Sequence, residues 1–71
     1  MMKRLLKVKH PVTVIRLGGK PAIIAELAED DLERKWPTGT TIQSTQVLTP
    51  IEDIGVGCVI ETMNTLYEVV E

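Results

Sequence analysis

Apolar and polar residues alternate along residues 56–70, in two runs that meet at positions 63–64. If the chain turns there, Ile60 lies opposite Tyr67 and Cys58 lies opposite Val69. These four side chains then share one face of a two-stranded element. The other face carries Val59, Glu61, Leu66 and Glu68. Because both runs agree on one register, the pattern predicts an antiparallel β-hairpin with one buried face.

The first part of the chain has the pattern of further strands. Residues 3–9 alternate partly, and Pro11 interrupts them because proline donates no hydrogen bond to a sheet. Residues 12–17 are rich in β-branched side chains, which favour strands. Gly18 and Gly19 supply the positive φ angles of a tight turn. We therefore expect strands over residues 3–9 and 12–17, with a turn after the second.

Residues 22–27 fit two structures. They can form the returning strand of a hairpin, or they can begin a helix with Pro21 at its first position. We favour the strand, followed by a short helix over residues 29–35. Acidic residues at the start of this helix and basic residues at its end would complement the helix dipole. Pro37 marks the end of the helix.

Residues 40–48 form the next expected strand, and most of its side chains are polar but uncharged. We call these residues the polar strip: Thr40, Thr41, Gln43, Ser44, Thr45 and Gln46. A strand of this kind is expected near an edge or a functional surface. Such an edge can pair with a second copy of the chain or with a partner strand.

Together these elements predict a mainly β protein with one domain over residues 1–71, about five strands and one short helix. Short strands between frequent turns suggest a small antiparallel SH3-like or OB-like open barrel. A sheet packed on a helix is the alternative. One Trp, one Tyr and no Phe leave the core to Val, Ile and Leu. Because domains of this size often gain stability by association, we expect a homodimer.

Cysteine content and hydropathy indicate the cellular compartment of the protein. Cys58 is the single cysteine, so no intrachain disulfide can form. No apolar run approaches the roughly 18 residues of a membrane span, and Lys7 and Lys9 interrupt the apolar residues near the N-terminus. We expect a reducing, cytoplasmic location and no membrane partner.

Charge is unevenly distributed around the net value of −2. All ten acids lie after residue 20, whereas residues 1–20 carry only basic charges. In the favoured interpretation, the basic N-terminal strand pairs with an acidic strand of the same chain, so that the two fields cancel. In the alternative, it binds nucleic-acid phosphates, and the residues involved are Lys3, Arg4, Lys7, Lys9 and Arg16. Few aromatic side chains are present for bases to stack on, so nucleic-acid binding is the second hypothesis.

The sequence offers little for catalysis or metal binding. One His and one Cys cannot supply the four ligands of a zinc site, and the acidic residues 29–33 lack the spacing and central glycine of a calcium loop. Cys58 is assigned to the core, where a thiol is inert, and His10 to the surface or an edge. We expect no enzymatic activity, no catalytic residue, no metal and no cofactor.

Trp36 stands beside the polar strip. It either closes one end of the barrel or anchors an interface, because Trp is enriched at binding hot spots. The sequence thus indicates a protein-interaction surface formed by Trp36, Thr41, Gln43 and Thr45.

Two segments carry a resemblance to known proteins. Residues 36–45 with Val47 place a Trp and a Gly before a threonine-rich strand, and residues 60–67 form an acidic-Thr-turn-Thr-x-Tyr hairpin. Together they resemble short uncharacterised proteins encoded by bacteriophages and prophages. The resemblance covers about half of the chain. It implies a phage or mobile-element origin, and with it a protein that binds and modulates a host or phage protein.

Overall fold

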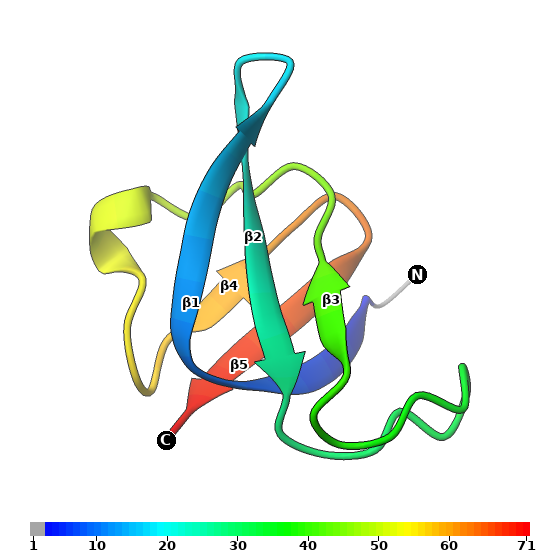
Figure 1. The fold of residues 1–71 in the computed structure, drawn as a ribbon. Coiled ribbons are helices and arrows are strands. Elements are labelled where there is room, and N and C mark those ends of the chain that lie inside the picture. The colour runs from blue at the N-terminus through cyan, green and yellow to red at the C-terminus, as the bar shows by residue number, and fades with distance from the viewer. Residues whose placement is uncertain (1–2) are drawn as a thin grey trace.

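A computed structural model of the chain describes residues 3–71. Within these residues the chain forms five strands and one 3-10 turn, η1, so the expectation of a mainly β protein is confirmed (Figure 1). The elements are β1 (Arg4–Leu17), β2 (Lys20–Leu27), β3 (Thr41–Gln43), η1 (Ile51–Asp53), β4 (Val59–Glu61) and β5 (Thr65–Val70).

The five strands form one mixed sheet in the order β3-β2-β1-β5-β4. The β1–β5 pair is parallel and the other pairs are antiparallel, so the expectation of a purely antiparallel sheet is wrong for this pair. The sheet also does not close into a barrel, because β3 and β4 lie at its two ends and do not pair with each other. Each of these end strands has only three residues, which leaves little backbone for closure.

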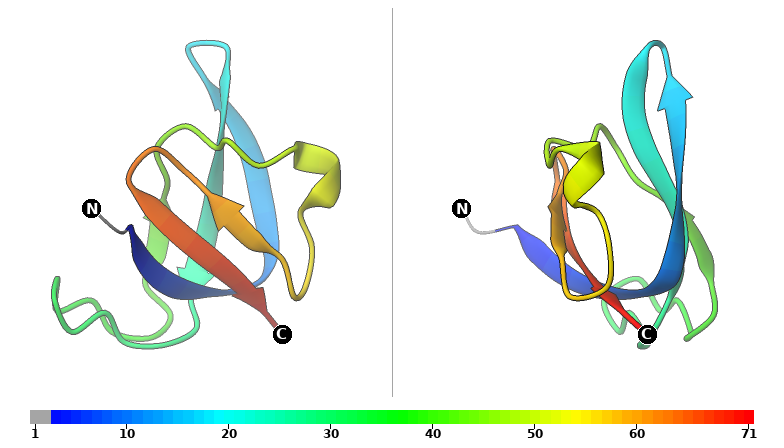
Figure 2. Two further views of the ribbon diagram at one scale, coloured as in Figure 1. Left: turned by 180° about the vertical axis from the view of Figure 1, so that it is seen from behind. Right: turned by 90° about the vertical axis from the view of Figure 1, so that its left-hand side faces the viewer.

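β1 is one long, strongly bent strand rather than the two strands expected around Pro11. Its register against β2 shifts between Lys9 and Thr13, so the ladder skips the residues around the proline and resumes beyond it. Residues 4–9 pair with β5, and the remainder of β1 pairs with β2 alone. The bend therefore carries the chain from one layer of the sheet to the other (Figure 2).

The C-terminal hairpin has the register that the alternation predicts. Ile60 pairs with Tyr67, and the Val69 N–H donates to the Cys58 carbonyl at 2.9 Å. Ile60, Tyr67 and Val69 are buried and Cys58 is half-buried against them, while Val59 is exposed on the other face. The predicted hairpin and its buried face are confirmed.

The helix expected over residues 29–35 does not form. Asp31 and Trp36 instead exchange two backbone hydrogen bonds of 2.8 and 3.0 Å around a tight loop. The Asp31 carboxylate also accepts the N–H groups of Glu33 and Arg34 at 3.2 and 3.4 Å. A side chain that bonds to nearby N–H groups in this way competes with helix formation. Residues 22–27 are part of β2, so the preference for a strand there is confirmed.

The strand expected over residues 40–48 is regular only over β3, which lies at the edge of the sheet as predicted. The chain beyond it still follows β2, because the Ser44 N–H donates to the Ile23 carbonyl at 2.9 Å and the Val47 N–H donates to the Pro21 carbonyl at 2.8 Å. Val47 thereby enters the core with 4% of its surface exposed.

The core lies between the two layers and is almost wholly aliphatic. Its buried apolar members are Val8, Ile23, Ala25, Leu27, Ile42, Val47, Ile60, Tyr67 and Val69. Among residues 3–71 there is no helix with the length and apolarity needed to cross a membrane.

Replacement of Ile60 by alanine tests the hairpin register. Ile60 is fully buried, so Ile60→Ala should lower the free energy of unfolding by about 2–5 kcal/mol in urea denaturation. Its neighbour Val59 is 48% exposed on the opposite face, and Val59→Ala should change that free energy by no more than about 0.5 kcal/mol. Equal losses in the two variants would contradict the assigned faces.

Candidate interaction surface

Two aspartates fix the loop that joins β2 to β3. Asp31 is buried and forms an ion pair with Arg4 of β1. Asp30 accepts the backbone N–H of Thr38 at 2.7 Å and its hydroxyl at 2.8 Å. At the far end of the loop, the Gly39 N–H donates to the Leu27 carbonyl at 2.9 Å, in a backbone conformation with a φ of 90° that favours glycine. These contacts hold the loop in one shape.

Both aspartates have a pKa below the ordinary value of an aspartate. For Asp31, burial raises the pKa, but the Arg4 guanidinium and the N–H groups of Arg34 and Glu33 outweigh burial and lower it. For Asp30, the hydrogen bonds from the backbone and side chain of Thr38 lower the pKa. The Asp31 Oδ2 atom has no hydrogen-bond partner and lies 3.9 Å from the Arg34 Nη1 atom.

The loop presents Trp36 and Arg34 together. The Arg34 guanidinium carbon lies 5.0 Å from the centre of the Trp36 ring, which is a cation–π contact. Trp36 keeps 37% of its surface exposed, so it does not serve as a fully covered lid over the core.

Trp36 and Arg34 border a hollow of about 260 Å³ in which three elements meet. The other contributors are the end of β3, the segment that follows it, and the β4–β5 turn with the start of β5. We call this site the Trp36 hollow; its lining residues are Arg34, Trp36, Ile42, Gln43, Thr45, Asn64, Thr65 and Tyr67. Three of the four interface residues expected from the sequence, Trp36, Gln43 and Thr45, are therefore brought together.

Internal hydrogen bonds fix two of the segments that line the Trp36 hollow. The Thr65 N–H donates to the Thr62 hydroxyl at 3.1 Å, and that hydroxyl donates to the Thr65 carbonyl at 2.8 Å. On the β3 side, the Ser44 hydroxyl accepts the Ile23 N–H at 2.9 Å and donates to the Thr45 carbonyl at 2.8 Å. Thr62, Thr65 and Ser44 are buried, so the exposed uncharged polar side chains of the lining are those of Gln43, Thr45 and Asn64.

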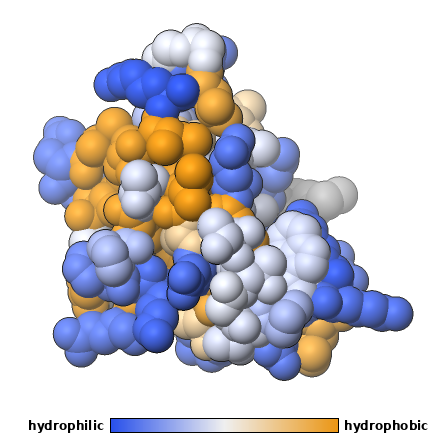
Figure 3. Space-filling view, in the orientation of Figure 1, coloured by the Kyte–Doolittle hydropathy of each residue, from blue (hydrophilic) through white to orange (hydrophobic). Residues whose placement is uncertain are grey.

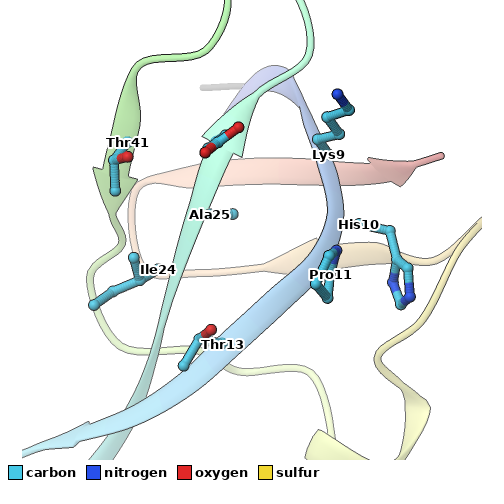
Figure 4. Close-up of a pocket in the computed structure, with 8 residues that line it drawn as sticks. Lys9, His10, Pro11, Thr13, Ile24, Ala25 and Thr41 are labelled. Atoms are coloured by element: carbon cyan, nitrogen blue, oxygen red, sulfur yellow. The ribbon is translucent and has the colours of Figure 1, made fainter.

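Thr41, the fourth expected residue, lies elsewhere. It borders a separate hollow of about 400 Å³ whose lining comes from β1, β2 and β3. Lys9 and His10 also line this hollow, but their side chains point in different directions and do not converge on one point (Figure 4).

The basic residues expected to contact nucleic acid are mostly engaged within the chain. Lys3 pairs with Glu61 at 2.6 Å, and Lys7 pairs with Glu29 at 3.3 Å. Arg4 contacts Asp31 and, at 2.9 Å, Glu33. Arg16 donates to the Gly19 carbonyl at 3.2 Å, and Lys9 borders the separate hollow. The basic strand is therefore paired within the chain, but its acidic partners are mostly in the β2–β3 loop rather than on a strand as expected, and Glu61 of β4 is the exception among these pairs.

Sequence reasoning missed three members of the Trp36 hollow. Arg34 was assigned to a helix end, and Tyr67 was assigned to the core, where it is indeed 95% covered. Asn64 stands in the predicted hairpin turn, but the alternation that locates a turn does not show which loop lies opposite. Arg34 and Trp36 come together through the tight loop closed by Asp31 and Trp36. Lys35 has a φ of 59° in this loop, and no pattern in the sequence indicates the loop.

Within residues 3–71, no group of three or more His, Cys, Asp or Glu side chains is arranged to hold a metal ion. Comparison of the chain with protein-family models, with curated proteins and with solved structures finds no match.

The lowered aspartate pKa values predict how stability depends on pH. Their contribution is fully present above about pH 3.9, the ordinary aspartate pKa, and is lost as pH falls from there through the lower folded-state values. Asp31→Asn should therefore reduce the loss of unfolding free energy between pH 5 and pH 2, as measured by urea denaturation at each pH. Asp53→Asn changes a carboxylate with no ion pair among the described residues, and it should retain the full wild-type loss. The same pH curve for wild type and Asp31→Asn would contradict the role of Asp31.

Proposed function

We propose that this chain is a non-enzymatic protein-interaction module whose contact surface is the Trp36 hollow. The observation that carries the proposal is the meeting of Trp36, Arg34 and Tyr67 at one concave site. Trp, Tyr and Arg are the residue types most enriched at protein-binding hot spots. A hollow that gathers all three, with uncharged polar groups at its rim, has the composition of such a site.

The rigidity of the surroundings supports the same proposal. Trp36 stands on a loop held by Asp30 and Asp31, and Tyr67 lies on a strand paired on both sides. A preformed site loses little conformational entropy when it binds, which favours affinity. The ligand that fits is a peptide segment with an apolar side chain for the Trp36 ring and backbone groups for Gln43, Thr45 and Asn64.

The biological setting of this proposal follows from the resemblance to phage and prophage proteins. A phage or mobile-element protein of this size would act by binding and modulating a host or phage protein, in the cytoplasm and without chemistry of its own. Nucleic-acid binding receives less support, because Lys3, Arg4 and Lys7 already have acidic partners.

Selection from a library of random dodecapeptides displayed on a surface tests the proposal. Peptides that bind the chain should shift or quench the fluorescence of Trp36, which is the single Trp. Trp36→Ala should weaken their binding by about 30-fold or more, which corresponds to the 2 kcal/mol of a hot spot. Arg34→Ala should weaken binding to a smaller degree.

Leu32→Ala provides the matched control. Leu32 lies in the same loop and is 83% exposed, but it does not line the Trp36 hollow. The variant should bind the selected peptides as the wild type does. The proposal fails if no peptide is enriched, or if enriched peptides bind Trp36→Ala and the wild type equally while circular dichroism shows both folded.

A further inference from the structure

The second half of β1 has a neighbouring strand on one side only. β5 pairs with β1 from Arg4 to Lys9 and no further. Beyond the bulge, β2 continues along β1 from Thr13 to Leu17. The other edge of this segment is therefore open, and we call it the open edge of β1.

Backbone alternation shows which groups face the open edge. Ile23 directs both its N–H and its C=O to the segment after β3, where they bond to Ser44. In an antiparallel ladder, two directly opposed residues either bond to each other or both point their N–H and C=O groups away from the partner strand. The residue opposite Ile23 therefore points its N–H and C=O groups away from β2. Val14 is that residue, so its N–H and C=O point to the open edge.

Arg16 repeats this pattern. Its partner in the ladder is Pro21, whose carbonyl accepts the Val47 N–H on the far side. Val14 and Arg16 thus offer two donors and two acceptors at alternate positions, and none of these backbone groups has a partner among residues 3–71.

The surroundings of the open edge are apolar. Val12 of β1 and Ile54 after η1 pack against the core and are only partly buried. Large apolar side chains of β1, of η1 and of the loop after η1 are between one third and one half exposed: Val14 36%, Leu17 46%, Ile51 37% and Val56 50%. The space-filling view shows a continuous apolar area over the upper part of β1 and β2 and towards η1 (Figure 3).

We propose that the open edge of β1 is a second docking site, at which an extended segment of a partner protein adds a strand antiparallel to β1. This inference does not rest on the Trp36 hollow. The added strand forms about four backbone hydrogen bonds with Val14 and Arg16. Its alternate apolar side chains cover Val12 and Ile54, which complete the core on that side.

Charge specifies one end of the segment. Arg16 and Lys20 stand at the tip of the β1–β2 hairpin, and neither has an acidic partner among the described residues. A strand antiparallel to β1 has its N-terminal end beside this tip. The segment therefore carries acidic residues at its N-terminal end, followed by alternating apolar positions.

Charge favours a partner segment over a second copy of the chain. A second copy docked at the open edge would present its own β1, which has no acidic residue to meet Arg16 and Lys20. η1 lies beside the open edge of β1 but in the other layer (Figures 1 and 2).

The two end strands of the sheet are poorer docking sites. The outer side of β4 is occupied, because the Leu48 N–H donates to the Glu61 carbonyl at 2.7 Å and the Met63 N–H donates to the Gln46 carbonyl at 3.1 Å. β3 is only three residues long and polar at its exposed positions. The open edge of β1 lacks these protections between Pro11 and the hairpin tip. Proteins usually protect such an edge, because an unprotected apolar edge promotes unwanted association.

The test uses a synthetic peptide with two N-terminal glutamates followed by seven residues of alternating valine and threonine. In amide exchange measured by NMR, saturating peptide should slow exchange of the Val14 and Arg16 amides about tenfold or more. The Ile15 amide already faces β2 and should change little. A peptide with lysines in place of the glutamates should bind about tenfold more weakly.

Two proline variants separate docking from folding. Val14→Pro removes an N–H that faces the open edge, so the sheet keeps its ladder bonds and only docking is lost. Ile15→Pro removes a ladder bond to β2 and should destabilise the fold itself. Neither residue lines the Trp36 hollow, so Val14→Pro should bind peptides selected through Trp36 as the wild type does.

Three results would overturn the proposal. The first is the absence of any change at millimolar peptide. The second is slower amide exchange at Trp36 and Gln43 but not at Val14 and Arg16, which would show that the peptide binds the Trp36 hollow. The third is protection of Val14 and Arg16 without peptide, together with a dimer mass in light scattering, which would make a second copy the occupant.

Discussion

β1 is the strand that joins the two layers of this small sheet, because it forms ladders on both of its sides. Val8 and Lys9 are paired on one side with Leu27 and Glu26 and on the other with Val69 and Val70. Without this double pairing, β2–β3 and β4–β5 would be two ribbons joined only by the few backbone hydrogen bonds of residues 46–48, and isolated two-stranded ribbons are marginally stable in water. The fully buried side chain of Val8 lies at this junction, so the core and the sheet depend on the same few residues.

The bend that lets β1 pair with strands of both layers also leaves one edge of its second half unpaired. Once β1 has turned away from β5, its second half pairs with β2 alone, and apolar side chains remain partly exposed there. On the far side of β2, the sheet ends in β3 and in a loop held by buried and surface carboxylates. The molecule thus has two surfaces of different character. One is a rigid concave site around an aromatic ring, and the other is an open backbone edge with apolar surroundings.

Several features of this fold follow from sequence alone. The hairpin register is predictable because two independent alternations must agree, and β2 is predictable from the glycine turn and β-branched residues before it. The pairing of the basic strand within the chain also agrees with the structure, but the expected acidic strand is wrong, because most of the acids lie in a loop. The expectation of a helix over residues 29–35 was wrong. It gave more weight to the charges at the helix ends than to the capacity of the Asp30 and Asp31 side chains to accept backbone N–H groups.

Other features depend on contacts between distant segments. Alternation within a strand shows which face is buried, but it does not show that β5 lies parallel to β1 or that the sheet stays open. Of the proposed interface, Trp36, Gln43 and Thr45 could be named because they cluster in sequence. Arg34, Tyr67 and Asn64 join them only through the placement of the β2–β3 loop beside the β4–β5 turn.

The parallel β1–β5 pair has a kinetic consequence. Arg4 pairs with Thr65, about sixty positions further along the chain, so much of the polypeptide must be ordered before this ladder can form. Closing so long a loop costs conformational entropy before the contacts of the ladder can offset that cost. The chain consequently belongs among the slower small domains, which reach their native state in milliseconds to seconds rather than microseconds. During that interval the apolar residues of both layers remain exposed to other molecules.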